Sequence, residues 1–209
     1  MHVLALPAIY ALELTPACNN RCPGCSNVYA AHRVGPPPLS GQEWRETLSP
    51  WLPEAVQVRL TGGEPLLHPN FWEILDLVTG YEARVTVFTN GRWDDPRAVV
   101  RRLRDRRALS GLLISLHGAD AVSHEAFTRV PGSFDETISN VRLAVEAWIA
   151  VALSTVITRH SWDQLDRVVA LGRSLGAQHV ALNRYIGAPL PEIEPTRPLY
   201  ISYAVVCLK

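Results

Sequence analysis

The sequence predicts an α/β fold built on a parallel β-sheet. Short apolar and β-branched segments alternate with amphipathic segments along the chain of 209 residues. Strict alternation of this kind favours parallel strands joined by right-handed helical crossovers, which wind either as an open sheet or as a barrel. No low-complexity linker interrupts the alternation.

Six segments have the alternation or the apolar run that is typical of a β-strand. They are residues 8–14, 56–60, 84–89, 112–116, 150–157 and 179–182. Five segments between them are predicted helices, at residues 40–48, 70–78, 96–107, 134–147 and 161–175.

Helix-terminal signals support these assignments. Ser40 is a suitable N-cap, and Pro96 suits a first helical position. Ser133 and Glu136 have the spacing of a capping box, which predicts a helix directly after Ser133. Gly176 is a natural C-terminal cap for the last predicted helix.

Composition argues against nucleic acid or a membrane surface as the main partner, because 20 basic residues balance 20 acidic ones. The arginine-rich run at residues 101–107 is interpreted as a solvated helix face. The apolar start of the chain lacks a basic leader and a cleavage site, and no run is long enough to span a bilayer. We therefore expect a protein of the reducing cytoplasm.

Three cysteines, Cys18, Cys22 and Cys25, lie within eight residues in a C-x3-C-x2-C pattern. Three thiolates hold three corners of an iron–sulfur cluster, whereas complete ligation usually takes four. The remaining iron is then open to a small molecule. A zinc site is the alternative, but zinc prefers four ligands in pairs, and the remaining cysteine, Cys207, is distant in the sequence.

Polar motifs follow the next three predicted strands. Gly62-Gly63-Glu64 follows the second strand, Asn90 ends the third, and Ser115 and His117 close the fourth. In a β/α barrel the loops after the strands meet on one face, which is where active sites lie. We therefore expect these motifs to lie beside the cysteine run.

Each motif has a chemical reason and an ordinary alternative. Glycines let backbone approach a ligand closely, and the carboxylate of Glu64 suits a positively charged amino group. The amide of Asn90 can donate and accept, and Ser115 can bond a ligand hydroxyl. Taken singly, the glycine and asparagine motifs are also common turns, Ser115 can bond a neighbouring carbonyl, and His117 is expected to be structural.

In combination and in this order, the motifs resemble the radical S-adenosylmethionine (SAM) superfamily, from about residue 10 to residue 185. The run Pro131-Gly132-Ser133-Phe134 resembles the SPASM or Twitch subgroup, whose members modify peptides, tetrapyrroles or protein side chains. The resemblance implies a partial (β/α)6 TIM-like barrel with six parallel strands, here expected to lack its last helix.

The resemblance also implies the chemistry. Cys18, Cys22 and Cys25 would hold a [4Fe–4S] cluster whose open iron binds SAM. Reductive cleavage of SAM would give a 5′-deoxyadenosyl radical that takes hydrogen from a peptide, protein, tetrapyrrole-like or other small-molecule substrate. A flavodoxin or ferredoxin is the expected electron donor.

By the same resemblance, Gly62, Gly63 and Glu64 would hold the amino group of SAM. Ser115 would contact its ribose, and Asn90 would lie near SAM.

Three further roles are assigned from position alone. Arg129 would meet the SAM carboxylate, Asn183 the adenine region, and Arg159 the substrate.

The chain also departs from the family pattern. Gly24 stands where the family usually has an aromatic residue, and Trp148 stands where a glycine is common, so Trp148 is expected either to sit at the rim or to strain its turn. After Pro195 the family continues with a helix and further cysteines, whereas residues 198–209 are short and apolar. We therefore expect a core at residues 1–186 and a proline-rich segment and tail at 187–209. A truncated or frame-altered product is expected, with a naturally short enzyme as the alternative.

Two alternatives remain at this point. One is a non-catalytic metal-binding protein with zinc or an electron-transfer cluster. The other is an inactive fragment of a longer radical SAM enzyme.

Overall fold

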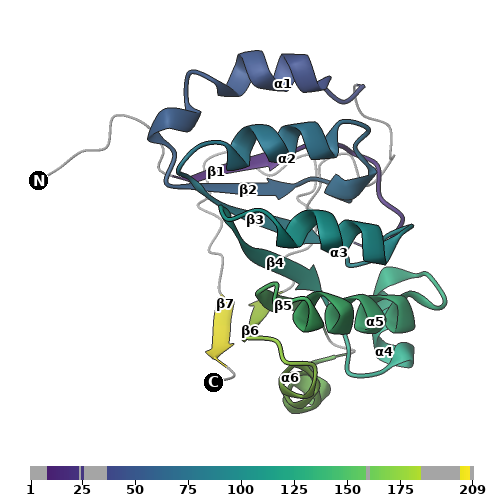
Figure 1. Ribbon diagram of the computed structural model, residues 1–209. Helices are drawn as coiled ribbons and strands as arrows, with labels where there is room; N and C mark the ends of the chain where they lie inside the picture. Colours follow the sequence, from purple (N-terminus) through teal and green to yellow (C-terminus); the bar gives the residue numbers. More distant parts are fainter. Residues whose placement is uncertain (1–8, 24, 26–36, 159–160, 185–202, 208–209) are drawn as a thin grey trace, which may run out of the picture.

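The computed structural model describes residues 9–23, 25, 37–158, 161–184 and 203–207. These residues form one curved sheet whose outer face is covered by helices (Figure 1). The strands are β1 (Ile9–Glu13), β2 (Gln57–Thr61), β3 (Arg84–Thr89), β4 (Leu109–Ser115), β5 (Val151–Ile157), β6 (His179–Arg184) and β7 (Tyr203–Cys207). The α-helices are α1 (Gly41–Leu48), α2 (Phe71–Thr79), α3 (Pro96–Arg104), α4 (Ala121–Thr128), α5 (Ser133–Glu146) and α6 (Leu165–Ser174). Three short 3-10 helices are η1 (Leu52–Glu54), η2 (Pro65–Leu67) and η3 (Trp162–Gln164).

The first six strands lie in sequence order and pair in parallel. This confirms the predicted α/β partial barrel with six parallel strands. The seventh strand, β7, was not predicted, and it pairs antiparallel with β6. The segment that follows β6 and the predicted boundary at residue 186 lie outside the described residues, so the two-part division stays a prediction.

The main core lies between the sheet and its helices. Alternate strand residues point to this layer and are almost fully buried, among them Val58, Leu60, Val85, Val87, Ile114, Leu153 and Val180. Helix α2 adds Phe71, Ile74, Leu75 and Val78 from one face. This packing fixes the parallel strands, and with them the edge at which all their carboxyl ends meet.

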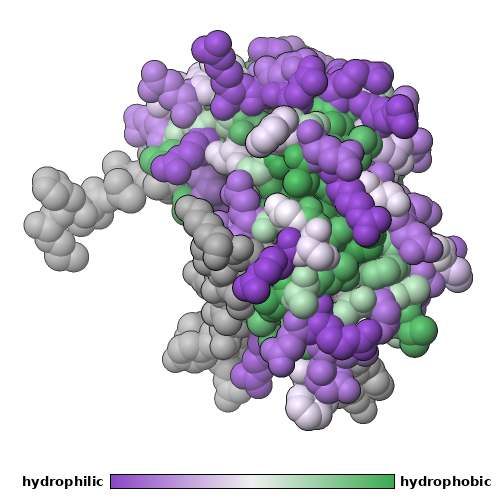
Figure 2. Space-filling view, turned by 60° about the horizontal axis from the view of Figure 1, so that its bottom comes forward, coloured by the Kyte–Doolittle hydropathy of each residue, from purple (hydrophilic) through white to green (hydrophobic). Residues whose placement is uncertain are grey.

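The surface also carries apolar residues. Figure 2 shows a face on which hydrophobic residues form a continuous area, bordered by hydrophilic residues. Among the described residues, no helix has the length and apolar character that crossing a membrane requires.

The helix starts partly follow the sequence signals. Ser40 caps α1 in a full capping box with Glu43, and Pro96 begins α3. The capping box predicted at Ser133 is wrong. Ser133 is the first residue of α5, after a Gly132 whose φ is 80°, and its hydroxyl lies 2.7 Å from that of Thr128.

Gly176 and Trp148 lie in two turns, and both have a positive φ. Gly176 follows α6 with a φ of 78°, which confirms its place at the end of that helix. Trp148 has a φ of 63°, and 95% of its surface is exposed. Its side chain therefore projects into solvent while its backbone holds a conformation that favours glycine.

Candidate functional site

The four predicted motifs meet at the carboxyl edge of the sheet. Glu13 pairs with Thr61 at the ends of β1 and β2, and Leu14 N–H donates to the Thr61 carbonyl at 2.9 Å. The cysteine run follows β1 at this edge, and Asn90 follows β3 two strands away. The expected gathering is therefore seen for the cysteine run, the Gly62-Gly63-Glu64 turn and Asn90.

The Gly62-Gly63 turn packs directly against the segment that leads into the cysteines. Gly63 N–H donates to the Thr15 carbonyl, and Glu64 N–H donates to the Ala17 carbonyl, both at 2.7 Å. A Cβ on Gly62 would lie 2.7 Å from the Thr15 oxygen, and one on Gly63 would collide with the Ala17 carbonyl. The two glycines were expected to let the backbone approach a ligand closely. They also let it approach the backbone of Thr15 and Ala17.

The Glu64 side chain links this turn to the loop after β3. It is fully buried, and one oxygen accepts from the Thr89 hydroxyl at 2.8 Å while the other accepts from Asn90 N–H at 2.7 Å. Burial raises the pKa of Glu64 to about 7, although these hydrogen bonds oppose the shift. The carboxylate therefore joins two loops of the site.

All three cysteines of the run are half-buried. Burial raises the pKa of Cys18, and the negative charges of Glu64 and Cys25 raise it further. Donors from Asn20 N–H at 3.4 Å and Asn90 Nδ2 at 3.8 Å act in the opposite direction. Metal binding to Cys18 would replace this proton, because the thiolate is the ligand form.

Within the described residues, which omit 24 and 26–36, no three Cys, His, Asp or Glu side chains are grouped closely enough to hold a metal ion. The donors nevertheless fit an iron–sulfur cluster, because three soft thiols lie on one loop and the charge of Cys25 reaches Cys18. Binding a cluster would require the loop to bring its thiols closer together.

The loop after β3 holds the cysteine run through the predicted Asn90 and through Arg92, which the sequence did not single out. Asn90 Nδ2 donates to the Asn19 side chain at 2.6 Å. Arg92 Nη1 donates to the Asn19 carbonyl and to the Asn20 side chain, each at 2.9 Å. Glu136 orients Arg92 by accepting from its Nε at 2.8 Å.

Only an indirect sequence signal points to the contacts of Arg92 with the cysteine run and with Glu136. Arg92 stands two residues after Asn90 in a turn, and Glu136 was assigned to the capping box that the structure contradicts. The pairing of Arg92 with Glu136 spans 44 residues, so no local pattern reveals it.

The other predicted SAM contacts lie farther along the edge. Ser115 pairs in register with Ser154, whose hydroxyl accepts from Asn183 Nδ2 at 3.0 Å. These three residues therefore lie close together across β4, β5 and β6. Arg129 is exposed at the end of α4, in a left-handed conformation with a φ of 56°. Arg159 lies outside the described residues.

His117 is buried and contacts its own chain, which is consistent with the structural role expected of it. Its Nδ1 lies 3.3 Å from the Val156 nitrogen and its ring packs on Phe127 with centroids 4.3 Å apart. Burial, and to a smaller extent the neighbouring His124, lower the pKa of His117 to about 3.

Cys207 does not join the cysteine run. It pairs in register with His179, at the amino end of β6, which is the opposite edge of the sheet from the cysteine loop. The register therefore argues against Cys207 as a fourth ligand for zinc.

A comparison with protein-family models matches residues 12–172 to the Radical SAM superfamily. The mycofactocin maturase MftC of Mycobacterium ulcerans is 33% identical over 180 residues, which are 84% of this chain and 47% of that protein. The AdoMet-dependent heme synthase of Methanosarcina barkeri is 28% identical over 176 residues, 82% of this chain and 48% of that protein. The chain thus spans about half the length of the curated relatives it matches.

The fold is also similar to that of solved structures. Streptococcus suis SuiB bound to S-adenosylmethionine superposes with a TM-score of 0.78 at 17% identity, covering 91% of this chain and 43% of SuiB.

Proposed function

Because the chain belongs to the radical SAM superfamily, we propose that it cleaves SAM reductively at a [4Fe–4S] cluster. When bound, the cluster supplies one electron to SAM, giving methionine and a 5′-deoxyadenosyl radical that takes a hydrogen atom from the substrate. The observation that carries the proposal is the carboxyl edge itself, where the cysteine run is held by the Gly62-Gly63 turn and by Asn90.

Cys18, Cys22 and Cys25 would ligate three irons. Asn90 and Arg92 would fix the backbone between the first two cysteines, through the bonds that they make to Asn19 and Asn20.

Gly62, Gly63 and Glu64 would meet the SAM amino group. An ammonium group near Glu64 would favour its ionised form, which burial alone disfavours. Ser115 and Asn183 would contact the ribose and the adenine region, which their shared neighbour Ser154 supports.

Arg129 would bind the SAM carboxylate. It follows Thr128, whose carbonyl accepts from Arg21 N–H at 2.8 Å, so the end of α4 lies beside the cysteine run. Its exposed side chain leaves the guanidinium accessible to a ligand.

We propose a peptide or protein as the substrate, because the relative with 33% identity is a maturase. A tetrapyrrole is the second candidate, favoured by the similarity to a heme synthase. A flavodoxin or ferredoxin would supply the electron in the cytoplasm. The SPASM or Twitch subgroup stays a prediction.

Metal analysis after anaerobic reconstitution tests the proposal. We expect about four iron and four sulfide per chain. Alanine at Cys18, Cys22 or Cys25 should lower both, whereas Cys207→Ala should retain them because Cys207 lies at the other edge. Zinc without iron or sulfide would instead support a non-catalytic metal-binding protein.

A further inference from the structure

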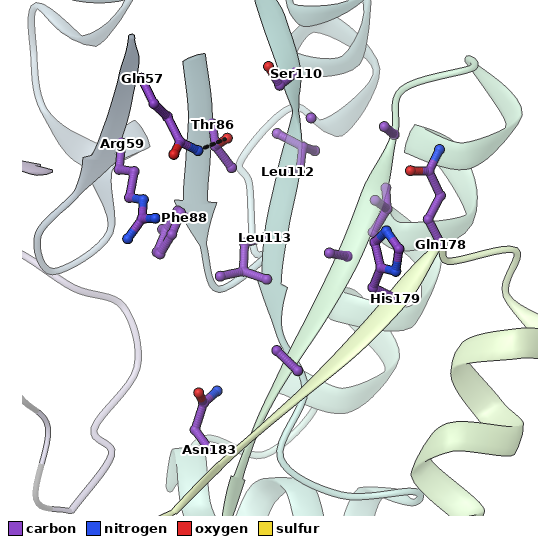
Figure 3. A pocket seen from close by; sticks show the side chains of 15 residues that line it. Gln57, Arg59, Thr86, Phe88, Ser110, Leu112, Leu113, Gln178, His179 and Asn183 are labelled. Carbon is purple, nitrogen blue, oxygen red and sulfur yellow. Dashed lines mark hydrogen bonds between the residues drawn. The ribbon is translucent and has the colours of Figure 1, made fainter. Parts of the chain in front are cut away.

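A cavity of about 660 Å³ lies against the inner face of the sheet, opposite the helices. Figure 3 shows it between β2 and β3 on one side and β6 on the other, with Asn183 nearest the carboxyl edge. Its volume is in the range of pockets that hold small ligands or parts of larger ones. Because Asn183 is a predicted SAM contact, the cavity extends from the proposed reaction site into the barrel.

Arg59 brings a positive charge into this cavity from the middle of β2. Its guanidinium carbon lies 5.9 Å from the centroid of the Phe88 ring, and the two side chains are adjacent in Figure 3. Its Nε atom is shielded from solvent and has no hydrogen-bond partner among the described residues. A shielded donor without an acceptor lowers the stability of the folded protein, and a ligand that accepts its hydrogen bond removes this cost.

Within the described residues, no acidic side chain forms an ion pair with Arg59. The described residues that line the cavity include neither Asp nor Glu. On the neighbouring strand, Glu13 pairs with Thr61, closer to the carboxyl edge than Arg59. Arg92, in contrast to Arg59, forms an ion pair with Glu136. Arg59 is therefore a charge without an acidic partner in the part of the chain that the structure describes.

Other polar atoms also face the cavity. His179 Nδ1 is shielded and unpartnered within the described residues, and it lies across the cavity from Arg59 in Figure 3. Gln57 Nε2 reaches the Thr86 hydroxyl only at 3.5 Å, a long hydrogen bond that a ligand can replace. The cavity thus combines a cation and hydrogen-bonding groups with the apolar ring of Phe88.

We propose that this cavity receives a carboxylate-bearing part of the substrate, with the Arg59 guanidinium binding the carboxylate. A guanidinium matches a carboxylate in charge and planar geometry, and charge-assisted hydrogen bonds of this kind are stronger than neutral ones. This inference rests on the proposed function, because it names the substrate class of the same site.

Two probe pairs test the proposal on the anaerobically reconstituted protein. N-acetylphenylalanine and its amide represent a peptide end, while deuteroporphyrin IX and its dimethyl ester represent a tetrapyrrole. Dissociation constants come from titrations followed by ligand-observed NMR. In at least one pair, the acid should bind roughly tenfold or more tightly than its neutral counterpart, as expected for hydrogen bonds to charged groups. The pair that shows the preference identifies the source of the carboxylate.

Arg59→Gln should abolish this preference, whereas Arg59→Lys should keep part of it. Arg101→Gln, on the exposed side of α3, is the matched control and should change nothing. Equal binding of acid and neutral probes by the unmodified protein would overturn the proposal. So would an Arg59→Gln protein with an unchanged melting temperature that keeps the preference.

A separate measurement distinguishes the substrate from SAM. Equilibrium dialysis with SAM should give the same dissociation constant for Arg59→Gln and the unmodified protein. If Arg59→Gln lowered the affinity for SAM as much as the affinity for the acid probe, Arg59 would be assigned to SAM binding and the inference would be overturned. SAM cleavage without substrate tests the proposed function independently, because the probe titrations do not depend on turnover.

Discussion

At Gly63 the loop after β2 comes so close to the Ala17 carbonyl that no side chain fits between them. The hydrogen bond from Gly63 N–H to the Thr15 carbonyl holds the same two segments together. Gly63 therefore fixes the backbone just before Cys18, in addition to any contact with a ligand.

We expect Gly63→Ala to lower the free energy of unfolding by roughly 2 kcal/mol, because the new methyl group must push the two segments apart. Iron content after reconstitution should fall as well, since Cys18 moves with Ala17. Urea denaturation and iron analysis measure the two effects.

Gly80→Ala is the matched control for this substitution. Gly80 has an ordinary helical backbone, and its Cβ would meet carbonyl oxygens only at 3.3 Å. It should change the free energy of unfolding by about 0.5 kcal/mol or less. Equal effects of both substitutions would contradict the role given to Gly63.

His117 makes the protein sensitive to acid. Burial lowers its pKa to about 3, below the usual value of 6.5, so the folded state disfavours the charged ring. The stability that depends on neutral His117 is complete above pH 6.5 and is lost as the pH falls toward 3. Each pH unit in this window costs about 1.4 kcal/mol.

Between pH 7 and pH 5, the free energy of unfolding of the cluster-free protein should therefore fall by about 2 kcal/mol through His117 alone. His117→Asn keeps an acceptor for Val156 N–H and should remove this contribution, leaving those of His124 and Glu64, whose pKa values are also shifted. Urea denaturation at both pH values checks it, and an unchanged slope in the variant would contradict the assignment.

At the scale of elements, the loops and helices around the cysteine run act as a clamp. Arg92, in the loop after β3, contacts the run, and Glu136 of α5 holds Arg92. The end of α4 adds the bond from Arg21 N–H to the Thr128 carbonyl. The loop that carries the cysteines is thus contacted by the loop after β3 and by the end of α4, and α5 supports it through Arg92.

The turn between α5 and β5 stores strain at Trp148. Its left-handed backbone costs a non-glycine residue about 1–2 kcal/mol, and its exposed side chain returns little packing energy. Trp148→Gly should raise the free energy of unfolding by about 0.5–1 kcal/mol, after the greater freedom of glycine in the unfolded chain is subtracted.

Trp162→Gly provides the comparison for Trp148→Gly. Trp162 is also exposed, but it lies in η3 without a positive φ. Its replacement should lower the free energy of unfolding or leave it unchanged. Urea denaturation gives the free energy of unfolding of both variants. A lower value for Trp148→Gly than for the unmodified protein would contradict the claim that the backbone at Trp148 is strained.

Sequence patterns predicted the six parallel strands but missed helix α4 and strand β7. The six parallel strands were predictable because their buried residues repeat with the period of a strand. Helix α4 was missed because its eight residues show only weak amphipathic order. Strand β7 was missed because its pairing with β6 depends on a contact distant in the sequence.

At the scale of the whole molecule, parallel order brings the ends of distant strands to one edge. This rule allowed the meeting of the cysteine run, the glycine turn and Asn90 to be predicted. It could not reveal Arg92, Glu136 or Arg59, because their roles depend on side-chain partners, or the lack of them, in three dimensions.

The formation of 5′-deoxyadenosine from SAM tests the central claim most directly. The anaerobically reconstituted protein with dithionite should produce it together with methionine, and Cys22→Ala should produce none above background. A protein that retains four iron and four sulfide, is fully reduced, and still forms no 5′-deoxyadenosine would contradict the proposed activity.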